Sequence, residues 1–326
     1  MRSRIVIATL LALALAPLGR ADGLPISDAG APATVGGANG NVRYVAVPTE
    51  RGTLVARLGE VVYASRLFDG RFTVPVVALD RTSSGLSTDR STLVLITPRQ
   101  TFPRARTTFL VLKAPTLRVR SQIVLKGDFS FDALSPDGTL MYVIHYLSPR
   151  DPTRYEVRAI AVATGKLMPS PIVDKSEPDE RMAGLPITRV TTVDGRFAYT
   201  LYDGAGKEPF IHALDTMNGE AKCIDLAALS GRQNLYDLRL DLNLGDTRLA
   251  VFDGAEEVIA VDARTYEPLS APVAAKEASS PPSRWPFVGL AALAVLLVVI
   301  GAAVLGLRRR LAHESRRSSP PSRVRT

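Results

Sequence analysis

The sequence predicts an all-β domain followed by one membrane-spanning helix close to the C-terminus. Two repeated turn patterns, each flanked by short apolar runs, indicate the strands, and one long uncharged segment indicates the helix. The first turn pattern places an aspartate ahead of a β-rich run, and it recurs at intervals of roughly 50 residues. Its four copies lie at 88–95, 136–143, 193–199 and 245–251.

The turn aspartates give a physical reason for strand pairing on both sides. Asp137 and Asp194 are each followed by glycine. Asp-Gly between two apolar runs favours a tight hairpin, because glycine accepts the positive φ that such a turn demands. The aspartate side chain adds hydrogen bonds to the neighbouring backbone. Each copy therefore predicts one strand before the turn and one after it.

A second turn follows a third strand in every unit, and a fourth strand comes after it. These fourth strands are predicted at Leu117–Val124, Lys166–Val173, Glu220–Leu226 and Pro268–Val273. Units of four strands and about 50 residues are typical of propeller blades. We predict an all-β fold, a β-propeller of about five four-stranded blades, with six or seven blades as alternatives. A β-sandwich with irregular hairpins is the competing fold.

The N-terminal part of the predicted propeller is less regular. A degenerate unit is expected within residues 53–79, with strands at Thr53–Leu58, Val61–Phe68 and Phe72–Leu79. An earlier strand at Val42–Val47 is expected to complete the last blade. That pairing would close the ring and leave no open sheet edge.

Two motifs carry a resemblance to a known family. Leu134-Ser135-Pro136-Asp137-Gly138 and Ala163-Thr164-Gly165-Lys166 resemble the turns of bacterial YVTN and TolB-type propeller repeats. In those repeats the first motif opens the second strand of a blade and the second closes the third strand. The resemblance covers about residues 85–273 and implies the fold, because turn motifs carry little information about activity.

The N-terminus has the three parts of a secretory signal peptide. Positive charge at Arg2 and Arg4 precedes an apolar run over 5–18, and small residues at Gly19 and Ala21 fit cleavage after residue 21. The apolar run is about 14 residues long, whereas a membrane span needs roughly 20. An uncleaved N-terminal anchor is the alternative interpretation.

The predicted membrane helix covers residues 287–307, which carry no charged side chain. As a helix this segment would be roughly 32 Å long, close to the thickness of the hydrocarbon core. Trp285 lies at one edge, where indole rings prefer the interface. Arginines follow the other edge at 308–310, 316, 317, 323 and 325. Because arginine-rich flanks stay in the cytoplasm, we expect a single-pass protein of the cell membrane with its N-terminal domain outside.

These features divide the chain into six parts. They are a signal peptide (1–21), a flexible leader (22–40), a β-propeller ectodomain (41–273), a stalk (274–286), a transmembrane helix (287–307) and a basic cytoplasmic tail (308–326). The formal net charge of +8 belongs to the ends, since residues 22–283 carry 29 Lys and Arg against 31 Asp and Glu, a net −2. The sequence therefore predicts no nucleic-acid partner.

Motifs for metal, nucleotide or acyl-transfer chemistry are absent from the sequence. There is no paired His or Cys spacing of a zinc site, no P-loop and no Gly-x-Ser-x-Gly elbow. His145 and His212 both lie in predicted strands and are expected to be packed or rim residues. Cys223, the one cysteine, is expected to be a buried structural thiol. We assign no catalytic residue, no metal and no cofactor.

The candidate ligand-binding residues lie ahead of two blades. Asp128 and Asp132 flank one short strand, and Asp237, Arg239 and Asp241 alternate along another. Innermost strands line the channel of a propeller, so these side chains could face a ligand there. Turn and inter-blade hydrogen bonding is the alternative.

A second acidic group lies between two units. Asp174, Glu177, Asp179 and Glu180 share a polar segment whose spacing does not match a calcium loop. We interpret this segment as a solvated loop rather than a metal site.

Two classes of function remain open at this point. The first is a membrane-tethered binding or scaffold module at the cell envelope, with an envelope protein or a small ligand on the propeller face. The second is an extracytoplasmic propeller enzyme, such as a quinoprotein-like dehydrogenase, a lyase or a lactonase. The second would need a convergent set of metal or acid–base residues on one face.

Overall fold

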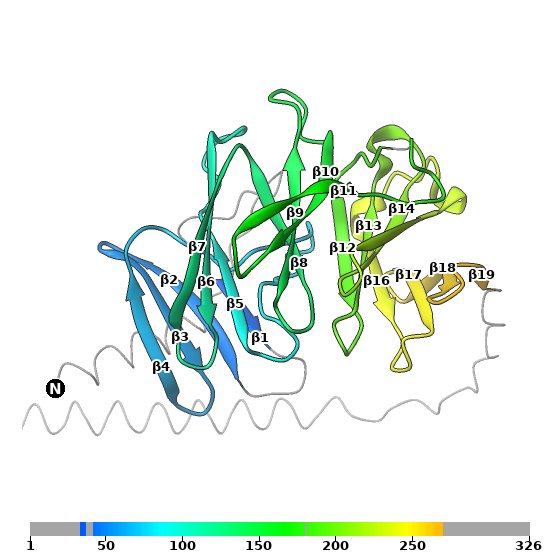
Figure 1. Cartoon of the computed structure of the whole chain (residues 1–326). Coiled ribbons are helices and arrows are strands. Elements are labelled where there is room, and N and C mark those ends of the chain that lie inside the picture. Colours follow the sequence, from blue (N-terminus) through cyan, green and yellow to red (C-terminus); the bar gives the residue numbers. More distant parts are fainter. Residues whose placement is uncertain (1–32, 37–41, 180, 270–326) are drawn as a thin grey trace, which may run out of the picture. The chain divides into compact units, whose positions relative to one another are not determined.

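The computed structural model describes residues 33–36, 42–179 and 181–269. The described chain is built almost entirely of antiparallel strands with three short 3-10 helices, so the prediction of an all-β domain is confirmed (Figure 1). None of the helices in the described part is long and apolar enough to span a membrane. The predicted signal peptide, stalk, membrane helix and tail lie outside the described residues.

The first sheet corrects two expectations about the N-terminal part. Its strands are β1 (Ala33–Gly36), β2 (Arg43–Thr49), β3 (Gly52–Leu58) and β4 (Val62–Phe68), in the order β1-β2-β3-β4. The strand expected at Val42–Val47 is present as β2. Its expected pairing with the last blade is wrong, because β2 pairs with β1 and β3 instead. Its nearest apolar partner is the next strand along the chain, which a two-residue turn brings into register. β1 itself lies within the segment expected to be a flexible leader.

The second sheet has three strands, β5 (Thr92–Ile96), β6 (Arg106–Lys113) and β7 (Arg118–Lys126). The expected strand Phe72–Leu79 is not formed. In its place are two isolated bridges, Thr73↔Ile96, which contacts β5, and Val76↔Ser83. Pro75 lies between these bridges and has no backbone N–H to give to a ladder, which accounts for the break.

The remaining three sheets confirm the predicted unit of strand, aspartate turn, strand, loop, strand, turn, strand. Each is an antiparallel meander of four strands. The third sheet holds β8 (Phe129–Leu134), β9 (Leu140–Tyr146), β10 (Tyr155–Ala161) and β11 (Lys166–Ile172). The fourth holds β12 (Pro186–Thr191), β13 (Phe197–Tyr202), β14 (Phe210–Asp215) and β15 (Glu220–Asp225). The fifth holds β16 (Leu238–Leu242), β17 (Arg248–Asp253), β18 (Glu256–Asp262) and β19 (Pro268–Leu269).

The predicted role of the turn aspartates is visible atom by atom. In the β8–β9 turn, the Ser135 hydroxyl donates to Asp137 Oδ1 at 2.6 Å, and Thr139 N–H donates to the same oxygen at 3.0 Å. The β12–β13 turn repeats the arrangement, with Thr192 Oγ1 at 2.7 Å from Asp194 Oδ1. One carboxylate therefore satisfies two donors that the hairpin leaves without partners.

Glycine in this turn also comes close to a distant part of the chain. Gly195 has φ of 76°, and a Cβ built on it would lie 1.9 Å from Thr88 Oγ1. Gly138 makes the same kind of approach to Thr92. The Asp-Gly signal thus specifies both the turn conformation and a close approach to the residues at or just before the start of β5.

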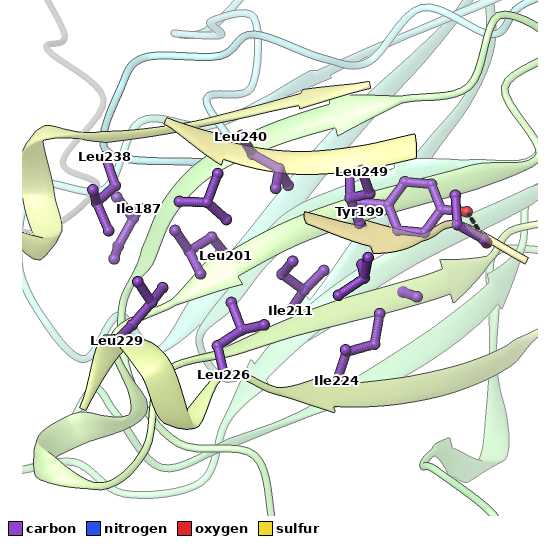
Figure 2. Close-up of a cluster of buried hydrophobic side chains, with 14 residues drawn as sticks. Ile187, Tyr199, Leu201, Ile211, Ile224, Leu226, Leu229, Leu238, Leu240 and Leu249 are labelled. Atoms are coloured by element: carbon purple, nitrogen blue, oxygen red, sulfur yellow. Dashed lines mark hydrogen bonds between the residues drawn. The ribbon is translucent and has the colours of Figure 1, made fainter. Parts of the chain in front are cut away.

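The hydrophobic core consists of layers between consecutive sheets. Separate clusters of buried side chains join the first sheet to the second, the second to the third, the third to the fourth and the fourth to the fifth. Figure 2 shows the last of these layers, with Leu201 and Ile211 of the fourth sheet near Leu240 and Leu249 of the fifth. Sheets stacked face to face in chain order are arranged like propeller blades, whereas a β-sandwich has two facing sheets.

Candidate functional site

Asp128, the first predicted site residue, lies just before β8 and is buried in an ion-pair network. Arg99 Nη2 lies 2.7 Å from its Oδ1, and Arg104 Nε lies 3.1 Å from the same oxygen. The Arg104 backbone N–H also donates to Oδ2 at 3.0 Å. Burial, with Arg99 beside it, lowers the pKa of the Arg104 guanidinium to about 10. Asp128 therefore holds the loop between β5 and β6 against the third sheet.

Asp132, the second predicted residue, joins two sheets. It lies in β8 and pairs with Arg189 of β12, whose guanidinium donates to both the carboxylate and the backbone carbonyl of Asp132. Arg189 Nε donates to Thr200 Oγ1 at 2.7 Å. Both charged side chains are almost fully buried. The pair ties the third sheet to the fourth, as the inter-blade alternative proposed.

The other three predicted residues lie on the fifth sheet and its leading turn. Asp237, Arg239 and Asp241 are exposed. Arg239 Nη1 lies 4.0 Å from Asp241 Oδ2, and its guanidinium stacks over Phe252 at 5.4 Å from the ring centroid. No interaction in the described part of the chain joins these residues to Asp128 or Asp132. The common ligand surface for all five stays a prediction.

A pocket between the third and fourth sheets provides a different candidate. Its volume is about 390 Å³, and its walls come from β10, β11, β14 and β15 with residues 173–179 and 181–183, which lie between the two sheets along the chain. Pockets for small ligands occupy roughly 300–1,000 Å³. The pocket therefore has the size of a small-ligand site.

His212 of β14 is the unusual side chain of this pocket. It lines the pocket, is 1% exposed, and neither ring nitrogen has a hydrogen-bond partner. Burial lowers the pKa of its imidazole to about 4, so the ring is neutral at pH 7. The prediction that this histidine is packed is confirmed, but its polar atoms are unsatisfied. Buried polar groups nearly always have a partner, so this exception calls for an explanation.

The apolar floor of the pocket is formed by side chains from both sheets. Tyr155 and Phe210 belong to a buried cluster, with Ile172 and Met182 packed against it. The Phe210 ring stacks on Tyr202 with centroids 5.2 Å apart. The floor therefore presents aromatic and aliphatic surface, which suits a ligand with an apolar portion.

Asp174 fixes one wall of the pocket. Lys222 Nζ lies 3.0 Å from its Oδ2, the Cys223 backbone N–H donates to that oxygen at 3.0 Å, and Ser176 N–H donates to Oδ1 at 2.8 Å. Burial alone would raise the pKa of Asp174, but the hydrogen bonds outweigh it and lower the pKa to about 2. The expectation that Asp174 lies in a solvated loop is wrong, because these partners draw its carboxylate into the inter-sheet contact.

The remaining carboxylates of the pocket are less engaged. Glu177, Asp179, Glu208 and Asp225 line it, together with the cations Arg181 and Lys207. Glu177 and Asp179 are exposed, as the solvated-loop interpretation expected, and Glu180 lies outside the described residues. Cys223 is half-buried and lines the same pocket. Across the described residues, no group of His, Cys, Asp and Glu is arranged to hold a metal ion.

The charge of the domain is divided between its two halves. Residues 42–127, which include the second to fourth strands of the first sheet and the whole second sheet, carry 14 Lys and Arg against 5 Asp and Glu, a net +9. Residues 128–269, which form the other three sheets, carry 14 against 23, a net −9. The pocket lies in the negative half. The near-neutral total of residues 22–283 hides this division.

The solved structures similar to this chain include β-propellers. The Dos1 propeller matches at 8% identity over 74% of this chain and 58% of that chain, with a TM-score of 0.45. TolB from Acinetobacter baumannii matches at 17% identity over 71% of this chain and 52% of that chain, with a TM-score of 0.39. The putative TolB from Agrobacterium tumefaciens matches at 13% identity over 71% of this chain and 81% of that chain, with a TM-score of 0.36.

These likenesses assign neither an activity nor a family to this chain. Their TM-scores lie below 0.5, and the chain spans less than two thirds of the length of the Dos1 propeller. No family model matches the chain, and no curated protein matches it. Membership of the TolB-type repeat family therefore stays a prediction from the turn motifs.

Proposed function

We propose that this protein is a binding module of the cell envelope, tethered by its C-terminal helix, and that the pocket between the third and fourth sheets holds its ligand. The tether and the export signal rest on the sequence of residues 1–21 and 287–307. The stacked sheets supply a rigid support for the pocket, since the buried Asp132–Arg189 pair joins its two walls. A TolB-type repeat would suit such a role.

The observation that carries the proposal is the unsatisfied imidazole of His212 in the pocket. Leaving a buried donor or acceptor without a partner costs about 1–3 kcal/mol. A ligand that supplies the missing hydrogen bond removes this cost. Its binding is therefore more favourable than it would be at a site where every polar group already has a partner.

Cys223 allows the pocket to be tested directly. It is the one cysteine of the chain. It lines the pocket on β15, where it is the cross-strand register partner of His212 on β14. We expect a pocket ligand to slow alkylation of Cys223 by N-ethylmaleimide several-fold in the full chain in detergent micelles. The candidate ligands to be tested form a panel of small amines, carboxylic acids, alcohols, amides and sugars.

The control moves the thiol to an exposed turn. In a Cys223→Ser, Met217→Cys variant the reactive group lies on a residue that is 59% exposed and does not line the pocket. A true pocket ligand leaves its alkylation rate unchanged. If no member of the panel protects Cys223 selectively, the pocket is not the binding site.

The tether has its own test. The full chain is expected to stay in the membrane pellet after alkaline carbonate extraction. Leu296→Asp combined with Val299→Asp should release it, because each charge at a helix centre costs roughly 2.5–3.5 kcal/mol. A Leu311→Asp variant in the tail is the matched control and should remain in the pellet. Release of the unsubstituted chain would contradict the tether.

A further inference from the structure

We infer that the pocket between the third and fourth sheets selects an organic cation, an ammonium group carried on a short apolar stem that ends in a hydrogen-bonding group. The inference rests on the proposed function and names the ligand class of the same site. Three features carry it: carboxylates at the pocket surface, a floor of aromatic and aliphatic side chains, and the unpartnered His212. Each feature matches a different part of such a ligand.

The carboxylates match the ammonium group. Glu177, Asp179, Glu208 and Asp225 line the pocket, and none of them has a cationic nitrogen within 4.0 Å among the described residues. Asp174 and Glu156, which also line it, are already paired with Lys222 and Arg158.

Two cations, Arg181 and Lys207, share the lining, so the four carboxylates without ion pairs outnumber them. Residues 128–269, which contain both sheets of the pocket, also carry a net −9. Charges of one sign lining a cleft raise the local concentration of the opposite ion. The electrostatic field at this pocket therefore favours a cation over an anion.

The floor matches the apolar stem. Tyr155, Ile172, Met182 and Phe210 present aromatic and aliphatic surface inside the pocket. A ligand that was only charged, such as a hydrated inorganic ion, would leave this surface in contact with water. Aromatic faces also attract an ammonium ion itself. The ligand that uses both the floor and the carboxylates is amphipathic.

His212 matches the far end of the stem. A neutral imidazole has one donor nitrogen and one acceptor nitrogen, and in His212 both are unsatisfied. A hydroxyl group can both donate and accept, so a single hydroxyl can partner either tautomer. An ammonium could satisfy only the acceptor. An amino alcohol is therefore the simplest molecule that uses every feature of the pocket.

The test compares three molecules of matched length by calorimetric titration of the full chain in detergent micelles. The probe is 5-amino-1-pentanol, and the analogues are neutral 1,5-pentanediol and anionic 5-hydroxypentanoate. We expect the amino alcohol to bind at least about tenfold more tightly than either analogue, which corresponds to the loss of one charge interaction. Pentylamine, which lacks the hydroxyl, is expected to bind more weakly than the amino alcohol.

Matched variants locate the interaction. Glu177→Gln with Asp225→Asn should weaken binding of the amino alcohol about tenfold. Glu256→Gln with Glu267→Gln removes two exposed carboxylates of the fifth sheet and should leave binding unchanged. His212→Leu should abolish the advantage of the amino alcohol over pentylamine, because only that advantage depends on the imidazole.

The outcomes separate this inference from the proposed function. If the diol or the hydroxy acid binds as tightly as the amino alcohol and protects Cys223, the pocket is a binding site and the cation assignment is wrong. If the amino alcohol binds but the pocket variants match the fifth-sheet control, the ammonium lies elsewhere and the inference is also wrong. If nothing in the wider panel protects Cys223, the proposed function fails as well.

Discussion

Replacing Arg189 by methionine is expected to destabilise the folded domain by about 3–5 kcal/mol. The guanidinium contacts the Asp132 carboxylate, and both side chains are almost fully buried. Methionine fills much of the same volume but leaves a carboxylate inside the protein without a counter-charge. The Asp132 Oδ2 atom already has no hydrogen-bond partner, so no second contact is available to compensate. The measurement is the free energy of unfolding from urea titration of the full chain in micelles, followed by circular dichroism.

Two further variants separate a buried charge from a lost contact. Arg239→Met removes an exposed arginine, 61% exposed at the side chain, and should change the free energy of unfolding by no more than about 0.5 kcal/mol. The double variant Asp132→Leu, Arg189→Met should recover most of the loss, because apolar pairs often replace buried ion pairs at little cost. If Arg189→Met is as stable as Arg239→Met, the pair does not hold the third and fourth sheets together.

Acidification between pH 6.5 and pH 4 is expected to cost about 3 kcal/mol of stability through His212 alone. Burial lowers the pKa of its imidazole to about 4 in the folded chain, against an ordinary value near 6.5 in the unfolded chain. Between these two pH values the imidazole of His212 is protonated in the unfolded chain but not in the folded chain. The free energy of unfolding therefore falls as the pH falls, and the fall is complete below about pH 4.

The His212→Leu variant isolates this contribution. Its free energy of unfolding should change less between pH 6.5 and pH 4 than that of the unsubstituted chain, by about 3 kcal/mol. Hydrogen bonding lowers the pKa of Asp174 to about 2, so its contribution is lost at a lower pH, between about 4 and 2. If the free energies of unfolding of the variant and the unsubstituted chain changed in parallel between pH 6.5 and pH 4, the imidazole would not be held neutral in the folded chain.

The local part of the fold was predictable because turns are decided by neighbouring residues. The aspartate turns at 137 and 194 were identified from the sequence, and their carboxylates cap the hairpins as expected. The strands on both sides followed from the alternation of apolar residues. Where a proline interrupts the pattern, as at Pro75, the expected strand does not form. A proline within an apolar run argues against a central strand, so this break was predictable from the sequence.

Sheet membership was harder to predict. Strand β2 was assigned to the last blade because closing a ring removes an open edge. Its actual partners, β1 and β3, are its neighbours along the chain. Pairing across a short turn costs far less conformational entropy than pairing across about 200 residues, so β2 pairs with its neighbours along the chain.

The candidate site divides in the same way. The sequence by itself determined the all-β architecture, the repeated four-strand unit and the residue types available for binding. Tertiary structure alone decided that Asp128 and Asp132 form ion pairs with arginines 29 and 57 residues away. It also decided that His212 lines a pocket and that its ring nitrogens have no hydrogen-bond partner. The physical reason is distance along the chain: a turn is a contact between neighbours, whereas this pocket joins side chains from two separate sheets that meet only when the sheets stack.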